Sequence, residues 1–426
     1  MAETVHTTDD VYGIARDLPL NYVERTAVDR RLVENLTRSK HIVIYGSSKQ
    51  GKTSLRKHCL NIDDYIMVQC SNKWSVADLH AAILKQAGYQ VTQSTKRTVA
   101  GRHKLLASLG GSVLGIGAKS EAEVEKEKGT EITTMELELD PEDVNDVIAA
   151  LNRIKFAKYI VLEDFHYLPT EAQKDFAVSL KAFHEASDLC FIVIGVWLEE
   201  NRLIVYNGDL TGRVVAVDAD RWTRAELQQV IDDGAALLNV RFANELSDRL
   251  LDRAFDSVYI VQEVCREACR RCSVFETQTY QKVINGMIDV PALIKEVVDQ
   301  QSGRYLSFIS QFADGFQETR LEMHRWLLYS ILNQSIDSLE AGVTYAEIRR
   351  NLQATHPSGS DLNLGNLTQA LQSCAALQVK KDIKPIILDY DQTNRRLNVV
   401  DRGFFIWIEN QDRQKLLDTA GLSASK

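Results

Sequence analysis

The residues with the clearest chemical meaning run from Gly46 to Thr53 and read Gly-Ser-Ser-Lys-Gln-Gly-Lys-Thr. They match the pattern G-x-x-x-x-G-K-[ST], in which a glycine-rich loop wraps its backbone N–H groups around phosphates. In this pattern Lys52 contacts the outer phosphates as a point charge, and the Thr53 hydroxyl is a ligand for Mg²⁺. The motif therefore predicts a site for a nucleoside triphosphate and its magnesium ion.

The segments on either side of this loop are the ones that the chemistry requires. His41–Tyr45 is a short apolar, β-branched run typical of a buried parallel strand, and residues 53–60 favour a helix because they contain neither Gly nor Pro. The N-terminus of such a helix adds a positive dipole to a phosphate site. The residues predicted to contact the nucleotide are Gly46, Ser47, Ser48, Lys49, Gln50, Gly51, Lys52, Thr53 and Ser54.

A second apolar run ends in a pair of acidic residues. Residues 159–162 (Tyr-Ile-Val-Leu) are followed by Glu163 and Asp164. Hydrolysis of a phosphoanhydride needs a carboxylate near the metal ion and a group that orients the attacking water. Two acids at a strand end can divide these tasks, so Glu163 and Asp164 are candidate hydrolytic residues. The alternative is a surface turn that begins with two acids.

Alternating strand and helix signals organise the first half of the chain. Strands are predicted at 41–45, 65–70, 159–162, 190–195 and 214–217, with helices such as 76–86 and 171–186 between them. This alternation predicts an α/β fold, a parallel sheet covered on both faces with its ligand at the carboxyl ends of the strands. Residues 109–140 interrupt the pattern. We interpret them as a β-hairpin insertion, turning near 128–130, with an acidic face that is either solvated or a docking surface.

The second half of the chain is mainly helical. Four helices, predicted at 224–238, 243–255, 258–272 and 280–288, form a helical lid over residues 219–300, after a nucleotide domain at 1–218. A bridging helix at 301–322 follows. Residues 323–426 contain three predicted helices (323–333, 344–353 and 366–377) and two strands (386–390 and 395–400) joined by a turn, which is a winged-helix pattern.

Composition restricts the functional classes. The chain of 426 residues is long enough for two or three domains. Its formal net charge of −9 disfavours a protein whose main role is to coat DNA, although a local basic patch remains compatible with it. The odd count of seven cysteines and a start without a basic or apolar leader lead us to expect reduced thiols and a cytoplasmic location without membrane contact.

Taken together, these motifs resemble the AAA+ and STAND branch of P-loop ATPases, over about residues 22–272. Tyr22-Val-Glu-Arg25 resembles the segment that packs against adenine in those families, which implies that Arg25 contacts the nucleotide. Glu163-Asp164 resembles the Walker B element with its two acids in inverted order, which implies Mg²⁺ for Glu163 and the water for Asp164. Arg213 occupies the place of an arginine that reaches the γ-phosphate, of a neighbouring subunit in AAA+ proteins or within one chain in STAND proteins.

The resemblance implies an ATPase with ATP and Mg²⁺ as ligands. Residues 194–197 and 255–262 lack the polar sensor residues of AAA+ unfoldases, so we expect slow hydrolysis and a regulatory switch coupled to a protein partner or to self-association. The alternative is an ATP-dependent DNA-binding initiator or transposition-type regulator, although the predicted recognition helix at 364–379 has no basic residue. A non-hydrolysing scaffold with structural ATP is a third possibility.

Overall fold

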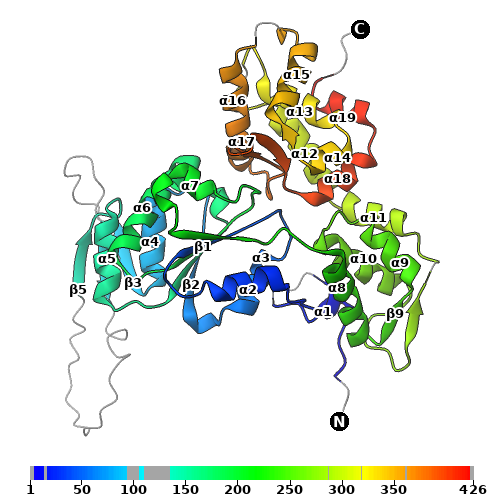
Figure 1. Ribbon diagram of the computed structural model, residues 1–426, viewed down its shortest axis with the longest axis horizontal. Helices are drawn as coiled ribbons and strands as arrows, with labels where there is room; N and C mark the ends of the chain where they lie inside the picture. The colour runs from blue at the N-terminus through cyan, green and yellow to red at the C-terminus, as the bar shows by residue number, and fades with distance from the viewer. Residues whose placement is uncertain are drawn as a thin grey trace.

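The computed structural model describes residues 4–13, 17–93, 105–109, 135–285, 287–317, 319–359 and 362–422. Figure 1 shows three groups of elements. A sheet unit, blue to green, carries the central strands. A lid unit, green to yellow, lies beside it, and a C-terminal unit (residues 301–422), yellow to red, lies above both. None of the helices in these ranges is long and apolar enough to cross a bilayer.

The central sheet of the described structure has five parallel strands in the order β2-β6-β7-β1-β8. They are β1 (His41–Tyr45), β2 (Tyr65–Gln69), β6 (Tyr159–Glu163), β7 (Phe191–Ile194) and β8 (Val214–Asp218). Strands β1, β6 and β7 are buried along their whole length, as expected for inner strands covered on both faces. The predicted α/β fold with a parallel sheet is confirmed, and each of the five predicted segments forms one of these strands.

Helices cover both faces of this sheet. On one face α2 (Thr26–Glu34) and α3 (Lys52–Cys59) contribute Val28, Leu32 and Leu55 to the core. On the other face lie α4 (Val76–Gln86), α5 (Val144–Arg153), α6 (Thr170–Ala186) and the short α7 (Arg202–Tyr206). The loops at the carboxyl ends of the strands are thereby held between two packed layers.

A smaller antiparallel sheet follows α4. Within the described ranges it contains β3 (Tyr89–Gln93), β4 (Leu105–Leu109) and β5 (Met135–Leu139), in that order. The alternating end of the predicted hairpin insertion is strand β5. The proposed turn at 128–130 lies outside the described residues.

The lid unit is helical, with one short sheet. Its helices are α1 (Thr8–Tyr12), α8 (Arg224–Leu237), α9 (Asn244–Leu251), α10 (Val258–Arg271) and α11 (Val290–Asp299). The predicted helix at 280–288 is wrong: β10 (Lys282–Ile284) pairs in parallel with β9 (Val240–Phe242). The reason is a period of two, because Ile284 is fully buried while its β-branched neighbour Val283 is 41% exposed.

The C-terminal unit combines helices with a three-stranded antiparallel sheet. Its sheet, in the described residues, has the order β11 (Val343–Thr344), β13 (Arg396–Val399), β12 (Leu388–Asp391). The helices are α12 (Ser302–Ala313), α13 (Met323–Leu332), α14 (Ile336–Glu340), α15 (Tyr345–Thr355), α16 (Leu364–Gln372), α17 (Cys374–Lys380), α18 (Arg402–Glu409) and α19 (Arg413–Thr419). The helix predicted at 366–377 is divided at Ser373, and one continuous apolar core joins this unit to the lid.

Candidate nucleotide-binding site

The loop between β1 and α3 has a backbone that favours glycine at two positions. Gly46 has φ +145°, and a Cβ there would lie 2.8 Å from the backbone nitrogen of Asp220. Gly51 has φ +81° and directly precedes the first residue of α3. Both angles lie in the region that disfavours other residues, so the two motif glycines set the path of the loop.

Lys52 is folded back onto its own loop. Its Nζ donates to the carbonyl oxygens of Gly46 (3.0 Å) and Ser47 (2.6 Å), and 8% of the residue is exposed. Burial lowers the pKa of Lys52 to about 8, although the negative charges of Asp220 and Asp164 oppose this shift. A phosphate group would therefore replace two carbonyl contacts of this ammonium with a charge–charge contact.

The two acids at the end of β6 point in different directions. Glu163 is buried, and its Oε1 lies 2.7 Å from Nε of Arg56 on α3. Asp164 adopts the left-handed region with φ 55°, where Gln69 donates to its carboxylate, and it lines the cavity that also contains Lys52. Burial raises the pKa of both acids, for Glu163 in spite of the opposing Arg56 charge.

Arg56 was not among the predicted site residues. A basic residue three positions after Thr53 on the same helix was the available signal, because such a residue lies one turn behind the loop. The pair also decides what each acid can do: Asp164 faces the cavity, whereas Glu163 neutralises Arg56.

A cavity of about 520 Å³ extends across the carboxyl ends of the strands. Seven of the nine loop residues predicted to contact a nucleotide line its middle, and Gly46 and Ser47 do not: the seven are Ser48, Lys49, Gln50, Gly51, Lys52, Thr53 and Ser54. The strand order gives it two ends. At the lid end the lining is mostly apolar: Pro19, Tyr22, Val23, Val230 and Val258. At the β6 end it is Asp164, His166, Tyr167, Val196 and Pro385. Its volume is in the range of sites for small ligands.

Arg25 is placed behind the cavity instead of in its wall. Its guanidinium donates to the carbonyl oxygens of Ala219 (2.9 Å) and Arg221 (3.3 Å) and lies 4.2 Å from the ring centroid of Trp222. Trp222 and Tyr22, in contrast, line the cavity. Arg25 thus supports the wall of the site through Trp222.

The C-terminal unit contacts the phosphate-binding loop directly. The backbone N–H of Ser48 donates to the carbonyl oxygen of Val400 at 2.8 Å. Asp220 accepts the N–H of Ser47 (2.7 Å) through one oxygen and Arg402 Nη2 (2.6 Å) through the other. Burial by itself would raise the pKa of Asp220, but the Arg402 charge and the Ser47 hydrogen bonds hold it below its usual value.

Further contacts fasten the same interface. Lys49 Nζ donates to Gln301 (3.0 Å), and the buried Arg202 pairs with Asp389 at 2.5 Å. Arg202 also contacts Glu199 at 3.3 Å, and this carboxylate accepts the hydroxyl of Thr393 at 2.8 Å. The docked position of the C-terminal unit is therefore specified by buried charges on both sides.

Arg213 lies at the amino ends of the central strands, whereas the cavity lies at their carboxyl ends. It precedes β8, and its carbonyl oxygen accepts the N–H of His41, the first residue of β1. The loop at Gly46 follows the other end of β1, and five strand residues span about 16 Å. Arg213 itself pairs with Glu185 at 2.8 Å. Within one chain, therefore, Arg213 does not reach the cavity.

One cavity residue has an unusual environment. His166 is buried in the short 3-10 helix η3 (Phe165–Tyr167), and neither ring nitrogen has a hydrogen-bond partner in the described structure. Burial, with the nearby charges of Lys52 and Arg202, lowers the pKa of His166 well below its usual value. Leaving a buried polar group unsatisfied costs about 1–3 kcal/mol.

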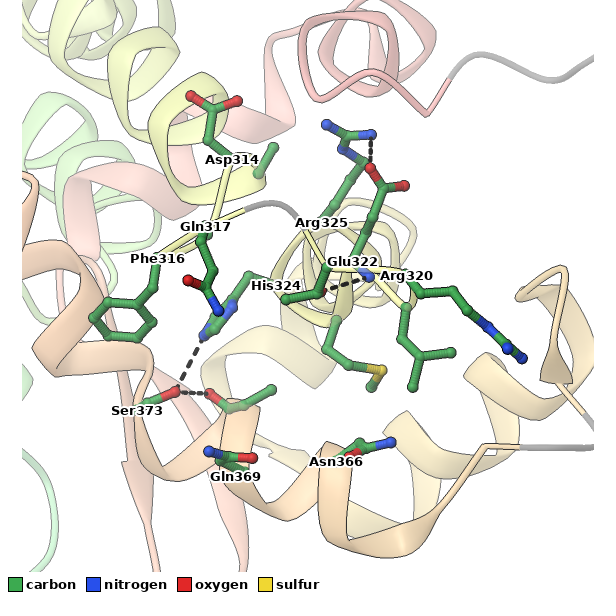
Figure 2. A pocket seen from close by; sticks show the side chains of 16 residues that line it. Asp314, Phe316, Gln317, Arg320, Glu322, His324, Arg325, Asn366, Gln369 and Ser373 are labelled. Carbon is green, nitrogen blue, oxygen red and sulfur yellow. Dashed lines mark hydrogen bonds and ion pairs between the residues drawn. The ribbon is translucent and has the colours of Figure 1, made fainter.

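A second cavity, of about 560 Å³, lies inside the C-terminal unit. Figure 2 shows the loop before α13 on one side of it and helix α16, with Asn366 and Gln369, on the other. His324 and Ser373 are joined across it by a 3.2 Å hydrogen bond between Nε2 and Oγ. Nothing in its lining connects it to the loop at Gly46.

Strand, glycine loop and helix at the carboxyl edge of a parallel α/β sheet define the fold of a P-loop nucleoside triphosphatase. Among solved structures the chain is similar to a Walker-type ATPase of Pyrococcus abyssi, PABY2304, with 13% identity, a TM-score of 0.53 and coverage of 92% of this chain and 99% of that one. At this identity the likeness concerns the fold.

Two further solved structures are more distant. They are the ORC2 protein of Aeropyrum pernix with ADPNP and ADP (13% identity, TM-score 0.45, 95% of this chain and 97% of that one) and the ORC1 protein of the same organism with DNA (12%, 0.44, 96% and 98%). No protein-family model and no curated protein matches the sequence.

Proposed function

We propose that this chain is an ATP-dependent regulatory switch of the AAA+/STAND type, in which the nucleotide competes with the C-terminal unit for the phosphate-binding loop. The observation that carries the proposal is the 2.8 Å hydrogen bond from the Ser48 N–H to the carbonyl oxygen of Val400. Loops of this kind use such backbone N–H groups to hold phosphate. The C-terminal unit thus occupies a donor that ATP needs.

Charge supports the same competition. Asp220 binds the N–H of Ser47 and the guanidinium of Arg402, so this carboxylate joins the loop to the C-terminal unit. A bound triphosphate brings several negative charges close to the Asp220 carboxylate, and this repulsion weakens the contact of Asp220 with the loop. A ligand shifts a conformational equilibrium by the difference in its affinity for the two states. ATP therefore favours release of the C-terminal unit.

The cavity also supports the expected magnesium ion and slow hydrolysis. Thr53 and Asp164 line it together, and hydroxyl and carboxylate oxygens are the ligands that Mg²⁺ prefers. With Glu163 held by Arg56, Asp164 is the carboxylate at the β6 end of the cavity. It has to serve either the metal ion or the attacking water, and a low turnover follows. The sequence-based role of Glu163 as a metal ligand requires that Arg56 first release it.

Arg213 supports a role for self-association. It lies at the amino ends of the strands, away from the cavity of its own chain. In this account its guanidinium therefore stabilises the γ-phosphate on a neighbouring copy. Its ion pair with Glu185 is partly exposed, with 31% of the Arg213 side chain accessible, and is therefore weak enough to exchange.

Nucleotide binding and hydrolysis by the full chain test this function. Isothermal titration with ATP and Mg²⁺ should show binding, and steady-state hydrolysis should be slow. Lys52→Ala should abolish both while its circular dichroism spectrum stays that of the wild type. Equal binding of ATP by the two folded proteins would refute the assignment of the site.

The alternative is a DNA-binding initiator or transposition-type regulator that uses the C-terminal unit as a winged-helix domain. The antiparallel order β11-β13-β12, together with helices α13, α15 and α16, supports the winged-helix interpretation. The two wing arginines are engaged inside the unit, however. Arg396 donates to the carbonyl oxygens of Ala341 (2.9 Å) and Gly342 (2.8 Å), and Arg395 lies over Tyr345.

A DNA-binding assay distinguishes the two functions. The initiator predicts steeply salt-dependent binding of duplex DNA that Arg395→Ala and Arg396→Ala weaken, together with ATP hydrolysis that DNA stimulates. The switch predicts hydrolysis that is indifferent to DNA.

A further inference from the structure

His166 is a buried polar side chain in the cavity that has no role in the proposed binding of phosphates and Mg²⁺. The residue is 4% exposed and lines the cavity two positions after Asp164. No described residue offers a hydrogen-bond partner to either of its ring nitrogens. Buried polar side chains almost always have a partner, and an exception in a ligand cavity calls for one that the ligand supplies.

The two ends of the cavity indicate which part of a nucleotide lies near His166. The lid end is lined mainly by apolar side chains such as Pro19, Val230 and Val258, and so suits a base. The loop that holds phosphates lies in the middle of the cavity, after β1. The β6 end, with Asp164 and His166, is then where the phosphate chain terminates.

We infer that His166 hydrogen-bonds to the terminal phosphate of a bound nucleoside triphosphate and thereby makes the site prefer a triphosphate to a diphosphate. An imidazole carries at least one N–H donor in either protonation state. A hydrogen bond from this donor to an anionic oxygen is of the charge-assisted kind, and a diphosphate leaves it unmade. The inference rests on the proposed ATP site and adds a residue that distinguishes its ligands.

The test measures dissociation constants of the full chain for a non-hydrolysable ATP analogue and for ADP, both with Mg²⁺, by isothermal titration. In His166→Phe the analogue should bind about tenfold to a hundredfold more weakly, the usual effect of a lost hydrogen bond to a charged group, while ADP binding stays the same. Thermal unfolding monitors the fold, and His166→Leu carries the same prediction if Phe is not accommodated.

Two polar replacements identify the donor nitrogen. The amide nitrogen of Asn lies near the position of Nδ1, and that of Gln lies near the position of Nε2. We expect one of His166→Asn and His166→Gln to recover part of the preference for the triphosphate. A purely structural role for His166 would give the same ratio of the two dissociation constants in each of these variants.

His80 provides a matched control. Like His166 it is buried, with one ring nitrogen unpartnered in the described structure, but it packs against Phe176 and Phe183 and does not line the cavity. His80→Phe should leave the preference unchanged. A wild-type ratio in folded His166→Phe or His166→Leu would overturn the inference alone. Absence of nucleotide binding by the wild type would overturn the proposed function as well.

Discussion

Removal of the Arg402 side chain is the sharpest perturbation of the proposed competition. Arg402 of the C-terminal unit makes two contacts: Nη2 contacts Asp220, which holds the Ser47 N–H of the phosphate-binding loop, at 2.6 Å, and Nη1 donates to the carbonyl oxygen of Phe255 in the lid at 2.7 Å. Arg402→Ala removes both contacts and leaves the phosphate-binding loop unaltered in sequence. We expect the C-terminal unit to dock less tightly and ATP to bind more tightly.

The magnitude follows from burial of the ion pair. Only 14% of the Arg402 side chain and 12% of the Asp220 side chain are exposed. Removal of one partner of a buried pair costs about 3–5 kcal/mol. Asp220 keeps its hydrogen bond from the Ser47 N–H, so we take the lower value, about 3 kcal/mol, for the lost docking energy. This corresponds to about a hundredfold in the docking equilibrium.

Isothermal titration of the full chain with ATP measures the effect. If docking suppresses binding, the dissociation constant of Arg402→Ala falls by up to the same hundredfold, limited by the fraction of wild-type chains already undocked. Arg325→Ala is the control, because it removes a 2.5 Å ion pair with Glu322 inside the C-terminal unit. Unchanged or weaker ATP binding by folded Arg402→Ala would refute the competition.

Three further predictions concern the site. Because burial lowers the pKa of Lys52 to about 8, most of its ammonium is present at pH 7, and in the free protein it is lost as the pH rises through this pKa. The dissociation constant for ATP should therefore rise between pH 7 and about pH 9.5, and a flat profile in titrations across this range would contradict the prediction. Arg56→Met should lower the free energy of unfolding in urea by about 3 kcal/mol because it strands the buried Glu163, and the double variant with Glu163→Leu should recover most of this loss. Arg213→Ala should keep the ATP affinity of the wild type but lower turnover at least about tenfold at protein concentrations where chains associate; an equal fall in a dilute monomeric sample would argue against action on a neighbouring copy.

The elements of the sheet unit were predictable because their signals are local. A run such as His41–Tyr45 is buried on both faces of the sheet. Its sequence is apolar nearly throughout, without the alternation of polar and apolar residues seen in half-exposed strands, and this pattern indicates a buried strand. The motif glycines likewise specify a backbone path that few other sequences allow. The short strand β10 was mistaken for a helix because three residues give too little periodicity to separate the two structures.

The partners of the site residues could not be predicted, because they come from distant parts of the chain. The order Glu163-Asp164 does not reveal which carboxylate faces the cavity; the left-handed turn at Asp164 and the charge of Arg56 decide it. The contact of Val400 with Ser48 joins residues about 350 positions apart and uses only backbone atoms, so no side-chain pattern marks it.

Hydrogen exchange of the full chain with and without ATP tests the central claim most directly. The account predicts slower exchange across residues 46–54, where the nucleotide binds, and faster exchange across residues 385–402, where the C-terminal unit leaves the loop. Lys52→Ala should show neither change. Slower exchange in both segments of the wild type would mean that ATP tightens the docked state, and would contradict the proposed switch.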